Sequence, residues 1–195
     1  SGTAGAQNNT VKNVNVYGAG ATAGTLLGIT FGGNAFGAAG TDNDNNRIEN
    51  NDLRGTFYGI ASLGASAANK NTGTVITRNV MSGTGTSGIG RIGIYVIFDD
   101  GVQITENNIA SVTTANAADC IGIGAGAQSV ATTAVGPFDV TNALIARNYI
   151  GFVNNTTTNS SLGIVMSSGP TGTNTVVNNM VTGVTGNADT PDIVV

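Results

Sequence analysis

The chain contains one adjacent pair of carboxylates, Asp99-Asp100, which Gly101 follows. Like charges at short range raise the pKa of one member of such a pair, and a carboxyl group with a raised pKa can act as a general acid. The chain has no His to add to this pair. The alternative, which we favour, is that Asp-Asp-Gly forms a turn between Phe98 and Val102.

A second group of acidic and amide oxygens occurs at 42–46, where Asp42 and Asp44 alternate with Asn residues. Calcium loops place oxygen ligands at alternate positions in this way. An EF-hand is excluded because the sixth and twelfth positions hold Arg47 and Leu53 in place of Gly and Glu. A looser Ca²⁺ turn at Asp42 and Asp44 and a solvated Asx-rich turn remain as alternatives.

Cys120 is the only cysteine, so no disulfide can form within the chain. A packed thiol is the simpler interpretation, and an intermolecular link is the other. The sequence predicts no other metal ligand set and no organic cofactor.

Composition excludes several classes of partner. The formal net charge is −4, and the seven Lys and Arg residues are scattered singly between Lys12 and Arg147, which argues against nucleic acid. No run approaches the ~20 apolar residues of a membrane span. Only 9% of residues are charged, so side-chain amides and hydroxyls must supply most of the hydration of the surface. We expect an extracellular or cell-surface protein on composition alone.

A repeated skeleton must position all of these residues. It consists of an aliphatic residue, two spacers, Asn, one spacer and another aliphatic residue, and its five copies occupy 48–53, 76–81, 104–109, 145–150 and 176–181. A second motif, apolar-Gly-Ile, alternates with the first and is centred on Gly28, Gly59, Gly93, Gly122 and Gly163, with a possible last strand at 192–195. Such a period predicts a solenoid, in which each unit packs only against its neighbours.

The spacing inside the first motif predicts a corner. Pleated strands return to one face every second residue, whereas the two aliphatic residues here are five apart. We expect the Asn to supply a left-handed bend, which it tolerates better than other non-Gly residues. Stacked coils then bring five Asn side chains into an amide ladder. Its members are Asn51, Asn79, Asn107, Asn148 and Asn179.

The residues just before three of these Asn are Arg78, Glu106 and Arg147. In register they form an outward Arg-Glu-Arg ladder. Its expected role is to select the register at little net energy, because exposed ion pairs contribute ~0–1 kcal/mol. A binding site for an anionic glycan is the functional alternative.

With this Asn corner and the inward aliphatic residues, the chain resembles right-handed parallel β-helix proteins, most closely the β-helical segments of large secreted bacterial surface proteins. The resemblance implies an all-β fold, a single-stranded right-handed parallel β-helix (solenoid) of about five to six coils. It covers nearly the whole chain, from Val11 to Val195. We expect a single domain, 1–195, with 1–10 as a frayed N-terminal segment, and this domain is either complete or a slice of a longer solenoid. Pectin-hydrolysing relatives share paired Asp residues, but the rest of their constellation is missing here. The two lysines, Lys12 and Lys70, look unsuited as lyase bases.

These observations favour a structural protein over an enzyme. The strand expected at 192–195 has no polar cap after it, and bare terminal coils either continue or stack on other subunits. We therefore expect a building block of a surface layer, sheath or filament that self-associates into a homopolymer. An extracellular domain that binds or processes a glycan, as a lyase or glycoside hydrolase, is the alternative.

Overall fold

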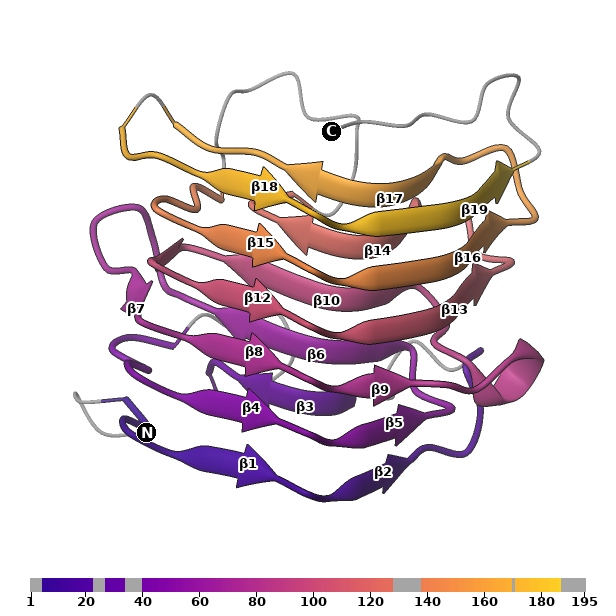
Figure 1. Ribbon diagram of the computed structural model, residues 1–195, viewed down its shortest axis with the longest axis horizontal. Helices are drawn as coiled ribbons and strands as arrows, with labels where there is room; N and C mark the ends of the chain where they lie inside the picture. The colour runs from indigo at the N-terminus through magenta and orange to yellow at the C-terminus, as the bar shows by residue number, and fades with distance from the viewer. Residues whose placement is uncertain (1–4, 23–26, 34–39, 128–137, 170, 187–195) are drawn as a thin grey trace.

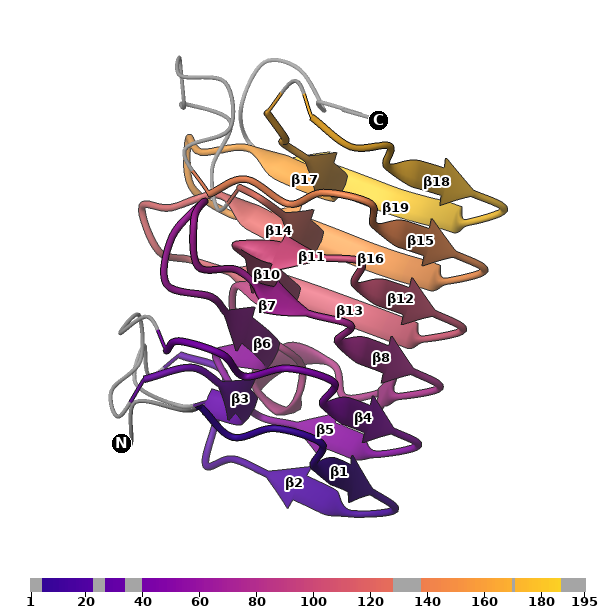
Figure 2. The same cartoon turned by 90° about the vertical axis from the view of Figure 1, so that its left-hand side faces the viewer.

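The computed structural model describes residues 5–22, 27–33, 40–127, 138–169 and 171–186. The fold is all-β, and its strands belong to parallel sheets that stack coil upon coil as a parallel β-solenoid (Figure 1). Within each coil the chain passes through sheet A, turns a tight corner into sheet B, and returns through sheet C, as the end-on corners in Figure 2 show. The predicted all-β, parallel architecture is confirmed.

Three parallel sheets, A, B and C, form the faces of the solenoid, and their strands follow one another in space in the order of the coils. Sheet A contains β1 (Thr10–Lys12), β4 (Arg47–Glu49), β8 (Val75–Thr77), β12 (Gln103–Thr105), β15 (Leu144–Ala146) and β18 (Thr175–Val177). Sheet B contains β2 (Asn15–Tyr17), β5 (Asp52–Arg54), β9 (Val80–Met81), β13 (Asn108–Thr114), β16 (Tyr149–Asn155) and β19 (Met180–Gly186). Sheet C contains β3 (Leu27–Phe31), β6 (Tyr58–Leu63), β10 (Ile92–Ile97), β14 (Cys120–Ala125) and β17 (Ser161–Met166). A small sheet pairs β7 (Asn71–Thr72) with β11 (Asp99–Asp100), and a short 3-10 helix, η1, spans Gly85–Ser87.

The repeat copies stack without a shift in register. In sheet A, Ile76 pairs with Ile48 on one side and with Ile104 on the other, and the column continues through Ile145 and Val176. In sheet C, Ile94 lies between Ile60 and Ile123. The first motif therefore spans the corner between sheets A and B, and the second motif lies in sheet C, which accounts for their alternation along the chain.

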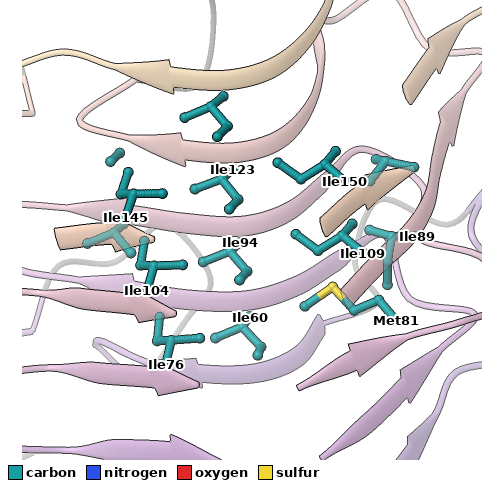
Figure 3. Close-up of a cluster of buried hydrophobic side chains, with 14 of the residues drawn as sticks. Ile60, Ile76, Met81, Ile89, Ile94, Ile104, Ile109, Ile123, Ile145 and Ile150 are labelled. Atoms are coloured by element: carbon teal, nitrogen blue, oxygen red, sulfur yellow. The ribbon is translucent and has the colours of Figure 1, made fainter. Parts of the chain in front are cut away.

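Aliphatic side chains from all three sheets fill the interior. Figure 3 shows Ile76, Ile104 and Ile145 of sheet A facing the column of Ile60, Ile94 and Ile123 from sheet C, and each of these six side chains is fully buried. Each fully buried Ile contributes ~1.5–3 kcal/mol of transfer free energy. With no Trp in the chain, these aliphatic stacks supply most of the driving force for coil formation.

The glycines of the second motif allow sheet C to pack closely against the interior. A Cβ on Gly122 would lie 2.5 Å from the carbonyl oxygen of Gly163 and 2.7 Å from a methyl group of Ile150. The equivalent atom on Gly93 would approach Gly122 and Ile109 in the same way. Sheet C can therefore approach the inward residues of sheet B only where it has no side chain.

A second apolar cluster packs on the opposite face of sheet C. It includes Tyr58, Ile92, Ile121 and Leu162, which occupy the first position of the apolar-Gly-Ile motif and are at most 6% exposed. Ile94 and Ile123, two residues further along, face the main interior instead. The strands pair on both sides of the glycine but not at it, so the backbone bends there and sends the two apolar residues to different clusters.

The N-terminal segment differs from the prediction of a frayed start at 1–10. From residue 6 onward it is hydrogen-bonded to the next coil, because the Ala6 and Asn9 amides donate to the Asn43 and Asn46 side chains. It leads into a sixth copy of the repeat at 11–16, in which Val14 stands where the other copies have Asn. The strand expected at 192–195 lies outside the described residues.

Candidate functional site

The predicted amide ladder lies inside the corner between sheets A and B. Asn107 Oδ1 accepts from both the backbone amide and the Nδ2 of Asn79, at 3.0 and 2.9 Å. Its own Nδ2 donates to the Ile76 carbonyl and to Asn148 Oδ1. Asn148 repeats this pattern in full. Asn51 Nδ2 donates in the same way, but among the described residues its Oδ1 accepts only from the Val14 amide. Asn179 donates to the carbonyl of Ile145. The ladder joins neighbouring coils through buried groups that would otherwise lack partners.

The left-handed bend is not made by the ladder Asn, as we had expected, but by the residue before it. Asn50, Arg78, Glu106, Arg147 and Asn178 have φ between 54° and 59°. Their backbone turns the corner and their side chains point outward, so that the following Asn can point inward. The five-residue gap correctly predicted a bend, but it could not say which of the two central residues makes it.

The expected outward charge ladder forms in part. Arg147 pairs with Glu106 at 2.9 Å, and both side chains are about half exposed. Arg78 instead contacts Glu49 of the preceding coil, which Arg47 also contacts. The hydrogen bond from Arg47, with help from Arg78, lowers the pKa of Glu49. A long Arg side chain can pair with any of several carboxylates within its reach, so the strand register alone did not predict this pairing.

A groove of about 380 Å³ lies beside this pairing, on the outside of the first three corners. It is lined by Lys12, Asn13, Glu49, Asn50 and Arg78. The Asn50 side chain donates to Asn13 Oδ1 and so joins two of the corners. Two cations and one carboxylate line the groove, which leaves it positively charged on a chain whose net charge is −4.

The carboxylate pair occupies a different corner, where Asp99 and Asp100 form β11 and not the turn that we favoured. The bends flank the pair, at Phe98 (φ 47°) and Gly101 (φ 81°). Asp99 pairs with Asn71, and the Asn43 amide donates to Asn71 Oδ1, so the three side chains form a second inward polar column. All three are at most 4% exposed.

This acidic column is less well satisfied than the Asn ladder. Asp99 Oδ2 accepts from Thr74 Oγ1 at 2.6 Å and from Ser62 Oγ at 3.2 Å. Among the described residues, no donor reaches Asp99 Oδ1, and the Asn43 Nδ2 likewise has no acceptor. Burial raises the pKa of Asp99 to about 7, hydrogen bonds from Thr74 and Ser62 oppose that rise, and the charge of Asp100 adds a smaller increase. The raised pKa that the pair suggested therefore has burial as its main cause.

Asp100 faces outward and belongs to a cluster that crosses three coils. Its Oδ1 accepts from Thr141 Oγ1 at 2.9 Å, and Lys70 Nζ donates to the same Thr141 hydroxyl at 2.8 Å. Lys70 also forms a salt bridge of 2.8 Å with Asp139, in which both side chains are 13% exposed. The hydrogen bond from Lys70 lowers the pKa of Asp139. Lys70 thus lies beside acidic groups, but its ammonium group is already engaged by Asp139 and Thr141.

The candidate calcium turn contains Asp44, which bonds to the next coil: its Oδ1 accepts from the Thr72 amide at 2.7 Å. Asp42 takes a left-handed conformation with φ 56°. In the described ranges no group of three or more His, Cys, Asp or Glu side chains could hold a metal ion.

Cys120 is fully buried, and its thiol donates to the Val112 carbonyl. Burial raises the pKa of this thiol to about 12, so the thiolate needed for disulfide exchange is scarce at neutral pH. This geometry agrees with the packed-thiol interpretation.

Sequence reasoning missed the acidic column although a signal for it was present. Asn43, Asn71 and Asp99 are separated by the same 28-residue step that separates Asn51, Asn79 and Asn107. The 28-residue step is evident for the Asn residues because each has an aliphatic residue on both sides at a fixed spacing. The second column lacks that frame, so Asp99 was considered only with its sequence neighbour Asp100.

Comparison with protein-family models, with curated proteins and with solved structures gives no match for this chain. In the described part of the chain, no helical segment has the length and hydropathy of a membrane span.

Proposed function

We propose that this chain is a right-handed parallel β-helix of about five to six coils that serves as an extracellular structural building block. Subunits stack end to end into a cell-surface layer, sheath or filament. The observation that carries this proposal is a difference in solvent exposure. The inward apolar side chains of the outermost described coils are more exposed than those of the coils between them.

The exposed fractions along one column show the difference. Val181 of β19 is 37% exposed, whereas Ile150 and Ile109, directly beneath it in the stack, are 0% exposed. At the other end, Val11 and Val16 are only partly buried. Open strand edges with apolar side chains favour pairing with further strands, and heterologous end-to-end contacts that do not close generate filaments.

The carboxylate pair supports this role over an enzymatic one. Asp99 has no exposed surface, so its carboxyl group is out of reach of a polymeric substrate. Lys70 is held by Asp139 and Thr141. A general acid and a base must each come within hydrogen-bond reach of the reacting atoms, and neither of these groups has that access. We therefore propose that the chain is not a hydrolase or lyase.

Sedimentation velocity over a range of concentrations, followed by electron microscopy, tests the structural role. Stacking predicts species that grow with concentration and fibres or tubes of regular width. A protein that stays strictly monomeric at high concentration would count against the proposal.

A second candidate function, binding of an anionic glycan, is favoured by the corner groove. Lys12 and Arg78 line it together with the amides of Asn13 and Asn50, which suits the carboxylates and hydroxyls of an acidic polysaccharide. This site differs from the Arg-Glu-Arg ladder that the sequence suggested, because Arg147 and Glu106 do not line the groove.

Affinity electrophoresis in gels containing either polygalacturonic acid or neutral dextran tests this candidate. We expect retardation in the acidic gel alone and loss of retardation in Lys12→Gln. Arg147→Gln removes the same charge outside the groove and serves as the control. Equal retardation of the two variants would contradict a site at this groove.

A further inference from the structure

Two aromatic side chains lie on the outer face of sheet B. Tyr149 is 40% exposed and Phe152 is 44% exposed. Both belong to β16, which lies between β13 and β19 in the stack (Figure 1). Because a described strand pairs with each edge of β16, the two rings are exposed through the outer face of the sheet and not through an end of the solenoid.

Each ring leans over a glycine. A Cβ added to Gly151 would lie 3.3 Å from Cε1 of Tyr149, and one added to Gly183 of β19 would lie 3.4 Å from Cδ2 of Phe152. The rings therefore occupy space that side chains at these two positions would otherwise fill. The glycines let the rings lean along the sheet, and they keep the outer surface beside each ring open.

Neither ring has an aromatic or cationic partner among the described residues. Tyr17, on β2 of the same sheet, shows the contrast. The Arg54 guanidinium lies 5.3 Å from the centre of the Tyr17 ring, and the Tyr17 hydroxyl donates to Asp52. Tyr17 thus belongs to a charged cluster, whereas Tyr149 and Phe152 remain available to a ligand.

Neutral polar groups border the two rings. Asn108 of β13 pairs with Tyr149 in the register, and Asn154 follows Phe152 on the same outer face. Asn154 Oδ1 accepts from the Thr185 hydroxyl at 3.0 Å. The sequence has no charged residue at 107–118 or at 148–188, so β13, β16 and β19 carry no charge.

We propose that Tyr149 and Phe152, with the flanking Asn108 and Asn154, form an aromatic surface that binds a neutral glycan of extended, equatorially linked pyranose rings. One face of such a sugar presents C–H groups with a small positive charge, which suit the negative face of an aromatic ring. The sugar hydroxyls lie around the ring edge, where side-chain amides can donate and accept. This surface differs from the corner groove, and its role does not depend on the stacking of subunits.

The spacing of the two rings favours a chain of sugars over a single sugar. Tyr149 and Phe152 are three residues apart, so their Cα atoms are separated by at most ~10 Å along β16. A disaccharide unit of a straight β-1,4-linked chain spans a comparable length. The glycan would therefore lie along β16. Met180 of β19, which pairs with Tyr149 and is 60% exposed, would contact its side.

Size and charge decide between this occupant and others. An aromatic side chain buries 150–250 Å² when fully covered, so two rings that are less than half exposed offer about 150–200 Å² together. A stable protein interface needs about 800 Å² from each partner. Single-stranded nucleic acid also stacks on aromatic rings, but it requires a positively charged groove, which these uncharged strands do not supply. A neutral glycan needs neither a wide apolar area nor a charge.

Isothermal titration calorimetry of the full chain with cellohexaose, a neutral β-1,4-linked glucan, tests the inference. We expect saturable binding by the parent protein and a dissociation constant about tenfold higher for Tyr149→Ala and for Phe152→Ala. Phe152→Tyr retains a ring and should retain the affinity. Tyr17→Ala is the matched control, because it removes an exposed aromatic side chain from the same sheet outside the aromatic surface. Unchanged melting temperatures of the outward Phe152 variants would show that a loss of binding is not a loss of fold.

The outcomes distinguish the aromatic surface from the charged groove and from unspecific contact. Binding at the aromatic surface should change little with salt, because neither partner is charged. Binding that weakened strongly with salt would overturn the inference and indicate the groove. Absence of cellohexaose binding would overturn it, as would equal weakening in Tyr17→Ala and Phe152→Ala. Equal binding of dextran, whose α-1,6 links make a flexible chain without a continuous apolar face, would overturn it as well. The structural role is tested by fibre formation, so either proposal can fail alone.

Discussion

The two inward polar columns of the solenoid, the Asn ladder and the column of Asn43, Asn71 and Asp99, use the same geometry with different success. In the ladder, each interior Asn accepts two hydrogen bonds and donates two, as Asn107 does. In the acidic column, the replacement of an amide by the Asp99 carboxylate leaves one oxygen without a donor among the described residues. An amide suits such a column because it both donates and accepts, whereas an ionised carboxylate only accepts.

The columns also differ in what surrounds them. The ladder faces the tightest corner, where every coil has an aliphatic residue on both sides of the Asn. The acidic column lies where two of the coils carry only the short strands β7 and β11. The comparison indicates that the ladder holds the coils in register, while the acidic column leaves a local weak point whose strength depends on protonation.

Removal of one amide from each column should give the largest effect. Asn107→Ala leaves the Asn79 amide and the Ile76 carbonyl buried without their partners, so we expect the free energy of unfolding to fall by about 3–5 kcal/mol. Asn71→Ala removes the acceptor of the Asn43 amide and one donor to Ser62, and we expect a loss of about 1–3 kcal/mol. Urea denaturation measures both.

The control for this pair must be an exposed Asn. Asn155 is unsuitable, because it is fully buried and donates to the Ala118 carbonyl. Asn116 is exposed, so Asn116→Ala should change the free energy of unfolding by less than about 0.5 kcal/mol. Equal losses for Asn107→Ala and Asn71→Ala would remove the distinction between the two columns.

The pH dependence of stability should show the next largest effect. The pKa of Asp99 is raised in the folded protein, from 3.8 to about 7, so between these values the folded state binds more protons than the unfolded state. The contribution of Asp99 to stability is therefore complete below the unfolded pKa and is lost as the pH rises through about 7. The slope should be at most ~1.4 kcal/mol per pH unit.

Asp99→Asn isolates this contribution. We expect the variant to lose the decline in stability between about pH 4 and pH 7 that the parent shows, measured as the difference in melting temperature between the two proteins at each pH. Asp100→Asn is the matched control, because the outward Asp100 retains solvent contact and the parent decline should persist. If stability declined by the same amount in Asp99→Asn, the pH dependence could not be assigned to Asp99.

The smallest expected effect concerns the left-handed residue of the ladder corner. Glu106 has φ 59°, a conformation that Asn adopts at lower energy than Glu. Glu106→Asn should therefore raise the free energy of unfolding by about 0.5–1 kcal/mol relative to Glu106→Gln. Both variants lose the pair with Arg147, so their difference in urea denaturation reports the backbone preference alone. A more stable Glu106→Gln would contradict the placement of the bend at this residue.

Much of the fold could be predicted because the repeat encodes it directly. The aliphatic frame around Asn51, Asn79 and Asn107 recurs at a fixed spacing, and parallel stacking of identical frames brings like residues together. The copy around Val14 was not predicted, because it lacks the Asn that identifies the other copies. The second apolar cluster on the far face of sheet C escaped because Ile92 and Ile94 look equivalent in the sequence and separate only where the backbone bends at Gly93.

The candidate site was less predictable for a physical reason. A repeat shows which residues share a column, but it does not show how deep a column lies or which partner a long side chain selects. The sequence could place Asp99 beside Asp100, yet only the packed coils bury the one and leave the other in contact with solvent. Likewise Arg78 stood next to Glu106 in the expected ladder, but in the fold it contacts Glu49, which Arg47 also contacts.

The sequence by itself determined the parallel stack of coils, the alternation of the two motifs and the five members of the Asn ladder, because these depend on periodicity and on side chains that meet copies of their own kind. The tertiary structure decided that the bend belongs to the residue before each Asn, that Asp99 is buried with an oxygen that no described donor reaches, and that the outermost described coils are incompletely covered. Those features depend on solvent exposure and on contacts between unlike residues, which no period in the sequence records.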